Sequence, residues 1–306
     1  IKAPKSVKPQ IFTFDITTGI VEDYMRLIDP RLTGFNNSHI VGALNTTTNS
    51  MTVDADVPYF QFKQFQFSDI KLKGSGDLQK LTLTGDLGNA QIGDSLMFPQ
   101  TAFTIQAQND VSDVTINTSS NQVINKANLS AQIKTFSDGA TILLNPSDFV
   151  LNGKTWSIDQ GGELNFRRNT VMQGGVTLRE SNQEIKLWTE PDAIGNWNNL
   201  RIAFQNVNLG DISPFISKKN RIEGLLNGDA TIEDPQKRLN INSNLTVNAA
   251  RLDNDSIGDI HATLGYDNQT GKRSMWVTNS DEEHHFDVDV AMNVKDTATN
   301  VTIRSQ

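Results

Sequence analysis

The sequence predicts an all-β protein: one elongated, mostly antiparallel sheet that curls into an open trough, with two short helices packed against it. The main observation is that apolar and polar residues alternate with period two along most of the chain, most regularly from Phe286 to Val294. Helical spacing of apolar residues occurs at only two places, about 18–28 and 211–218. Because each strand has one apolar face, an uncovered sheet of this kind would present that face as a functional surface.

The composition fits a thin sheet better than a compact globule. The chain has 306 residues, of which 37% are hydrophobic and 7% aromatic, and its mean hydropathy is −0.40. It has no cysteine, which excludes disulfides and cysteine-ligated metals. A net charge of −8 argues against a phosphate-binding surface, so we expect no nucleic-acid partner.

The two ends of the sequence indicate a fragment of a longer protein. The first residue is Ile1 rather than methionine, and a strand-like segment from Val301 to Ile303 lies almost at the C-terminus. No run approaches the roughly 18 apolar residues of a membrane span, and no signal peptide opens the chain. Residues 1–10 are predicted to be an extended lead-in, and 11–306 one continuous β-groove.

Each predicted helix has an apolar face and a start signal. The face of the first comprises Ile20, Tyr24, Leu27 and Ile28. Its expected N-cap is Thr17 or Thr18, and Pro30 lies beyond its end. The second helix is expected to begin with Asp211 as N-cap and Pro214 in its first turn. Its apolar face comprises Ile212, Phe215 and Ile216.

Nearly everything else is predicted to be strand and turn. The apolar phase of the alternating runs defines the residues expected to point into the trough: Val53, Ala55, Val57, Phe103, Ile105, Trp156, Ile158, Leu164, Phe166, Ile185, Leu187, Ile202, Phe204, Leu245, Val247, Ile260, Ala262, Leu264, Phe286, Val288, Val290 and Met292. A slip of one residue would turn a whole strand over. From Tyr59 to Phe67 the spacing of the phenylalanines, following Pro58, predicts a β-bulge that changes the phase.

Related helix-plus-strand units are predicted at about 17–85 and 205–277. At a shift of 188 residues the apolar face of the first helix falls on that of the second, and past the helices the shift becomes 190, which brings Gly34 onto Gly224 and Asp69 onto Asp259. Repeats of a β unit that cannot bury its own face indicate stacking along an axis. Shared patterning without duplication is the alternative.

No set of residues indicates catalysis, a metal site or a cofactor, so we expect a protein that is not an enzyme. The His284-His285 pair follows acidic residues in a predicted turn, and neighbours on a strand point to opposite faces. Two aspartate pairs could form a glycosidase or calcium site: Asp54 with Asp56, and Asp287 with Asp289. Their places as the polar positions of amphipathic strands are the simpler interpretation.

The tryptophans and three short tripeptides give weaker indications. Trp156, Trp188, Trp197 and Trp276 could stack on sugars, but their apolar neighbours make Trp156 and Trp276 packing or groove residues. Tripeptides that begin at Asp94, Asp255 and Asp296 are similar to the O-glycosylation sequon of Bacteroidota envelope proteins.

Four motifs between Ile133 and Val277 follow one another in a characteristic order. The most specific runs from Asn145 to Ile158 and contains S-x-F-x-[IL]-N-x-x-x-W-x-I. Looser patterns follow at Asn206 to Ile212, Gly224 to Ala230, Asp234-Pro235 and Ile257 to Ile260. This order resembles the translocation and assembly module subunit TamB of Bacteroidota, within the AsmA-like group of bridge-like lipid transport proteins.

The resemblance implies a β-taco, a sheet folded lengthwise around an apolar groove. It also implies a periplasmic segment of a longer protein, with an inner-membrane anchor upstream and an outer-membrane barrel assembly partner downstream, both outside this sequence. The implied function is to shield phospholipid acyl chains during inner-to-outer membrane transport and outer-membrane biogenesis, with the inward residues as the lipid groove.

Three other functions remain open from the sequence. A chaperone-like groove that assists the assembly of outer-membrane barrel proteins needs the same apolar trough, and its strand edges could pair with a client strand. A secreted adhesin or carbohydrate-binding β-solenoid shares the short Asn-, Thr- and Gly-rich strands. A structural spacer is the third.

Overall fold

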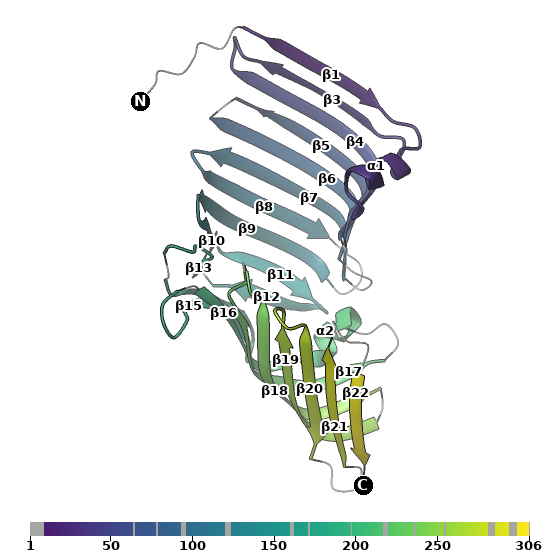
Figure 1. The fold of residues 1–306 in the computed structure, drawn as a ribbon, viewed down its shortest axis with the longest axis vertical. Helices are drawn as coiled ribbons and strands as arrows, with labels where there is room; N and C mark the ends of the chain where they lie inside the picture. The colour runs from purple at the N-terminus through teal and green to yellow at the C-terminus, as the bar shows by residue number, and fades with distance from the viewer. Residues whose placement is uncertain are drawn as a thin grey trace. The chain divides into compact units, whose positions relative to one another are not determined.

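The all-β prediction is confirmed in the computed structural model: the strands form one antiparallel sheet of 22 strands that is not closed, with two short helices (Figure 1). The structure describes residues 9–63, 65–77, 79–92, 96–119, 124–159, 162–170, 172–196, 198–216, 220–235, 237–253, 255–280, 285–293 and 299–305. Of the predicted lead-in, residues 1–8 lie outside the described residues.

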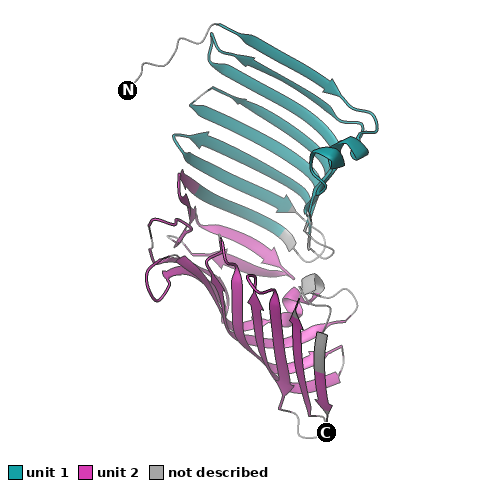
Figure 2. Ribbon diagram, in the orientation of Figure 1, with its two compact units in different colours: residues 1–132 teal, residues 133–306 magenta. Residues whose placement is uncertain are grey.

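The chain divides into two compact units, residues 1–132 and 133–306 (Figure 2). The elements that begin in the first unit are β1 (Ile11–Thr17), α1 (Glu22–Ile28), β2 (Leu32–Gly34), β3 (His39–Asn45), β4 (Ser50–Phe62), β5 (Phe65–Gly76), β6 (Lys80–Ile92), β7 (Leu96–Gln108), β8 (Val111–Ser119) and β9 (Ile124–Phe136), the last of which crosses the boundary. The second unit contains β10 (Gly139–Leu144), β11 (Ser147–Leu151), β12 (Lys154–Ile158), β13 (Gly162–Asn165), β14 (Gly174–Glu180), β15 (Gln183–Pro191), β16 (Asn198–Asn208), α2 (Leu209–Ile216), β17 (Ile222–Glu233), β18 (Asn240–Leu252), β19 (Asp255–Asp267), β20 (Lys272–Asn279), β21 (Phe286–Asn293) and β22 (Thr299–Ser305).

The strands of the first unit keep one phase from neighbour to neighbour. Val53 on β4 lies opposite Gly42 on β3 and Gly74 on β5, and Phe103 on β7 lies opposite Gly85 on β6. Directly opposite residues of antiparallel strands share a face. The face that carries Val53 therefore also carries Phe12, Phe14, Ile16, Ile40, Leu44, Met51, Ala55, Val57, Ile70, Leu72, Leu83, Phe103, Ile105, Val114 and Ile116.

One row of residues interrupts this alternation. Val57 pairs with Ile70, but the next apolar pair, Phe60 with Phe67, comes after three residues rather than two. Between them Asp69 has a φ of 51°, and two strands further along the sheet Gln100 has a φ of 49°. Left-handed backbone at single strand residues re-aims the side chains that follow, as in a β-bulge. The rings of Phe60 and Phe67 stack there, with their centroids 5.9 Å apart.

At the shift of 190 the two predicted related units share most of their strand pairing, from Met51 to Val57 and from Ile241 to Val247. Met51 pairs with Gly76 in the first unit, and Ile241 pairs with Tyr266 in the second. The amide of Lys63 donates to the carbonyl of Arg31 at 3.0 Å, and 190 residues later the amide of Asp253 donates to that of Arg221 at 2.7 Å. The correspondence therefore extends to hydrogen bonds, beyond what apolar patterning alone requires.

Both units also place a glycine at the same strained position. Gly34 has a φ of 103° and Gly224 a φ of 128°, a region that side chains rarely adopt. A Cβ on Gly34 would lie 2.9 Å from the Cα of Phe60, and a Cβ on Gly224 would lie 2.6 Å from Cγ1 of Val247.

Gly34→Ala and Gly224→Ala are therefore each expected to lower the free energy of unfolding by about 1–3 kcal/mol, because the new Cβ forces a strained backbone against a neighbouring strand. Gly19→Ala is the matched control, since a Cβ there meets no atom within 4 Å. Urea denaturation of the three variants checks this. A loss at Gly19 equal to that at Gly34 would contradict the explanation.

The helices differ from prediction at their starts. Helix α1 begins at Glu22, and no side chain of its own N-cap closes it. Instead Oδ1 of Asn36 accepts hydrogen bonds from the amides of Val21 and Glu22 at 2.7 and 3.1 Å. The expectation that Thr17 or Thr18 caps this helix is therefore wrong, because the acceptor comes from the loop between β2 and β3.

Helix α2 begins at Leu209, two residues before the predicted N-cap Asp211. The amide of Gly210 donates to Oδ1 of Asn208 at 2.9 Å, so Asn208 fills the capping role. Asp211 lies inside the first turn and is buried. Its carboxylate contacts Asn152 and Lys154 of the β11–β12 hairpin.

Candidate functional site

The strands of the second unit also keep one phase from β14 to β22. Val247 on β18 lies opposite Leu226 on β17 and Ile260 on β19, and Val288 on β21 lies opposite Val277 on β20 and Ile303 on β22. Following the register outward from these pairs places a series of residues on the same face: Val176, Leu178, Ile185, Leu187, Ile202, Phe204, Ala230, Ile232, Ile241, Leu245, Ala262, Leu264, Met275, Val290 and Met292. We call this the inner face of the second unit.

The predicted inward residues differ in how deeply they are buried. Five are buried: Ala55, Val57, Trp156, Ile158 and Leu164.

 Leu264 and Met292 are the most exposed, at 40% and 39%, and the other predicted residues are half-buried. Phe166 lies just past the end of β13, where its amide donates to the carbonyl of Ala140 at 2.9 Å.

The exposed residues of the inner face surround an open hollow of about 510 Å³. Leu264, Met275, Val290 and Met292 line it from three neighbouring strands, β19, β20 and β21. Arg273 lies at the same hollow, with its guanidinium 5.4 Å from the centre of the Tyr266 ring. The hollow therefore offers apolar surface together with one cation.

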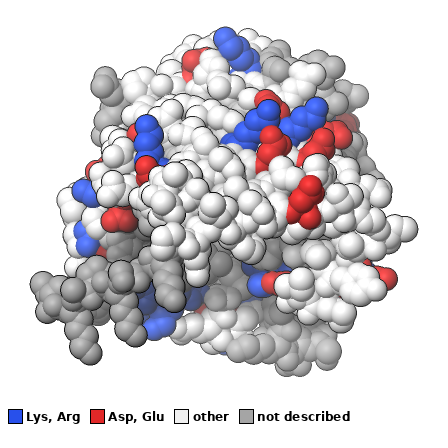
Figure 3. Space-filling model, turned by 90° about the horizontal axis from the view of Figure 1, so that it is seen from above, with Lys and Arg blue, Asp and Glu red and all other residues white. Residues whose placement is uncertain are grey.

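The polar face of the sheet carries charges of both signs. On β4, Asp54 lies opposite Lys73 and Asp56 opposite Lys71, and Nζ of Lys73 is 3.9 Å from Oδ2 of Asp54. Figure 3 likewise shows basic and acidic side chains beside one another. Neighbouring opposite charges on an exposed face contribute little to stability. They make this face hydrophilic, which supports the interpretation of the aspartates as the polar positions of amphipathic strands.

Trp276 lies on the face opposite to the inner face. It pairs with Thr263 and Asp289, whereas its neighbours Met275 and Val277 point to the inner face. Its Nε1 donates to Oδ1 of Asp287 at 2.9 Å. Of the two roles expected for Trp276, packing or groove residue, the register favours packing, because the half-buried ring lies on the face opposite to the inner face. The run of three apolar residues does not itself reveal the phase. Trp188 is also on the polar face, opposite Arg201, and Trp197 lies outside the described residues.

Trp156 packs at the most specific sequence motif. It is only 1% exposed and stacks on Phe149, its partner across the β11–β12 hairpin, with ring centroids 6.1 Å apart. The hairpin turns at Asn152 and Gly153, whose φ values of 49° and 76° are those of a tight two-residue turn. The motif therefore encodes a compact aromatic hairpin.

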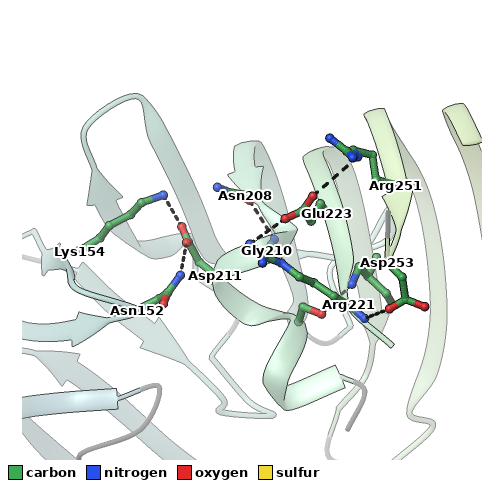
Figure 4. A network of polar contacts seen from close by, with 11 residues as sticks. Asn152, Lys154, Asn208, Gly210, Asp211, Arg221, Glu223, Arg251 and Asp253 are labelled. Atoms are coloured by element: carbon green, nitrogen blue, oxygen red, sulfur yellow. Dashed lines mark hydrogen bonds and ion pairs between the residues drawn. The ribbon is translucent and has the colours of Figure 1, made fainter. Parts of the chain in front are cut away.

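A polar network attaches α2 to this hairpin (Figure 4). Oδ2 of Asp211 is 2.6 Å from Nζ of Lys154, and its Oδ1 accepts from Nδ2 of Asn152 at 3.0 Å. The Asp211 side chain is only 4% exposed, whereas that of Lys154 is 36% exposed, so the carboxylate is buried and the ammonium still reaches water. Sequence reasoning missed this pair because 57 residues separate Lys154 from Asp211.

A second set of polar contacts holds the turn between β9 and β10. Asp138 accepts from the amide of Asn169 at 2.9 Å and from Nε of Arg167 at 3.0 Å. These bonds, first the Asn169 amide and then Arg167, lower the pKa of Asp138. The Arg167 guanidinium also stacks over Phe136, 3.8 Å from the ring centre. The contacts fix loops and leave no acidic group poised for proton transfer at this point.

Comparison with protein-family models, with curated proteins and with solved structures finds no match for this chain. Within the described ranges, no three His, Asp or Glu side chains are grouped so that they could hold a metal ion. Nor does any helix in the described part of the chain have the length and apolar character needed to cross a membrane.

His284 and two of the three glycosylation-like tripeptides, at Asp94 and Asp296, lie outside the described residues. Asp255 opens β19 at an exposed position.

Proposed function

We propose that the chain is a segment of a TamB-like, periplasmic bridge whose inner faces hold phospholipid acyl chains in an apolar groove, without catalysis. The observation that carries the proposal is the constant phase of the strands, which sets apolar side chains beside one another across successive strands in each unit. In this proposal the sheet curls as a β-taco, and a full-length protein provides the inner-membrane anchor and the contact to an outer-membrane barrel partner.

The chemistry of the face suits acyl chains. Each CH₂ group that moves from water into apolar surroundings contributes about 0.8 kcal/mol, so a chain can be held without contacts to its headgroup. Transport further requires similar affinity along the face, so that a lipid slides rather than lodges. Side chains of Val, Ile, Leu, Ala and Met repeat from β17 to β21 and offer such uniform contacts.

The alternatives make different demands on the sheet. A β-solenoid of the adhesin type is built from parallel coils, whereas the strand pairs described here are antiparallel. A chaperone for barrel proteins would use the same face, and the outer edges of β1 and β22 could pair with a client strand. Lipid and protein cargo are therefore separated by what the face captures.

Photo-crosslinking in cells tests the proposal. A photoreactive residue at Val247 or Val288 is expected to form adducts with phospholipid, identified by mass spectrometry, because both positions lie on the inner face. Asn244 and Asp289 are the matched controls, since both are exposed on the opposite face of the same two strands. Capture of protein alone at Val247 and Val288 would favour the chaperone function, and equal capture at all four positions would refute a cargo face.

A further inference from the structure

The positions that are buried in helix α2 are more exposed at helix α1. In α2, Leu209, Asp211 and Ser213 are all buried. At the shift of 188 their counterparts in the first unit are Val21, Asp23 and Met25, and none of these is buried.

The exposed surface around α1 is unusually apolar. Ile20, Leu27 and Ile28 are exposed by 85%, 83% and 74%, and Tyr24 by 66%. Exposed apolar patches of this kind mark interaction sites. We call Ile20, Asp23, Tyr24, Leu27 and Ile28 the α1 surface.

The second unit shows what such a helix binds. The turn of the β11–β12 hairpin presents Asn152 and Lys154 to the carboxylate of Asp211 (Figure 4). The counterpart carboxylate, Asp23, is exposed, and its side chain makes no hydrogen bond or ion pair with the described residues. The adjacent acid does not share this freedom, because Glu22 pairs with Arg26 at 2.6 Å.

We propose that the α1 surface docks a β-hairpin of the β11–β12 type, whose turn supplies a lysine and an amide to Asp23. The expected partner is therefore a protein segment with a two-residue Asn-Gly turn flanked by strands and a lysine directly after the turn. The apolar side chains beside Asp23 are covered by the body of the hairpin. Charge complementarity selects this partner, because Asp23 repeats the acceptor that Lys154 and Asn152 satisfy in the second unit.

The probe is a head-to-tail cyclised peptide with the sequence of residues 147–158, added to the full chain. Cyclisation keeps the two strands of the peptide paired. An NMR contact between its Phe149 and Trp156 rings, which stack in the protein, is the check that the peptide is folded. The peptide is expected to bind saturably and to slow amide hydrogen exchange across 21–28, with no equivalent effect on α2, whose Asp211 is already paired.

Two matched changes define the contact. Lys154→Met in the peptide and Asp23→Asn in the protein are each expected to weaken binding about tenfold, and the two together by little more than one alone, because they remove the same charged hydrogen bond. Both changes are at exposed or peptide positions, so the fold of the protein is preserved.

Three outcomes would overturn the proposal. The first is unchanged exchange in 21–28 at millimolar concentrations of the folded peptide. The second is equal binding by the Lys154→Met peptide. The third is slowed exchange of α1 with phosphatidylethanolamine–phosphatidylglycerol vesicles but not with the peptide, which would assign the surface to a membrane instead.

Discussion

Replacing Trp156 with alanine is expected to lower the free energy of unfolding by about 3–5 kcal/mol, the range for a large aromatic side chain removed from a closed site. The indole is only 1% exposed, and its stacking on Phe149 is lost with it. Thermal or urea unfolding, followed by circular dichroism, measures the change.

Two other variants separate packing from chemistry. Trp156→Phe is expected to cost much less than Trp156→Ala, because the indole Nε1 is buried without a hydrogen-bond partner in the described structure, and phenylalanine removes that unpaired donor. Trp276→Ala is expected to cost under about 1.5 kcal/mol, because this half-buried ring lies on the polar face. Equal losses at Trp156 and Trp276 would show that burial is not the cause.

The features that could be predicted from sequence are those that depend on the spacing of apolar residues over a few neighbouring positions. Alternation over a few residues is enough to place a strand, and the run from Phe286 forms β21. The two helices were likewise predicted near their observed positions, because three or four apolar residues at helical spacing are a local signal. Part of the first unit's apolar face, including Ile70 and Leu72, was missed even though the two residues alternate. Gly74 is the next residue of the same alternation, and because glycine has no side chain, the apolar pattern of the strand stops there.

The features that sequence could not predict depend on distant residues. The cap of α1 is Asn36, which comes from the loop between β2 and β3. Asp211 has the side chain of an N-cap but is an acceptor for a lysine from another hairpin. Trp276 sits in the run Met275-Trp276-Val277, so its face was fixed only by its partners on β19 and β21. In each case the deciding contact is tertiary, and local pattern carries no information about it.

A charge on the inner face is expected to stop lipid passage while the sheet stays folded. Val247→Asp places a carboxylate opposite Leu226 and Ile260. A lipid chain that slides over this position must bury the charge without a partner, which costs several kcal/mol. Because each 1.4 kcal/mol corresponds to a factor of ten, we expect phospholipid adducts at Val288 to fall by at least about tenfold.

The measurement compares lipid adducts from a photoreactive residue at Val288 in two backgrounds, Val247→Asp and Asn244→Asp. Asn244 is exposed on the polar face of the same strand, so the second variant adds the same charge without interrupting the apolar path. Far-UV circular dichroism of both purified variants must match that of the parent. Loss of adducts in both backgrounds would indicate a general effect of charge. Unchanged adducts in both would mean that lipids do not travel along this face, because an uninterrupted apolar path is what sliding requires.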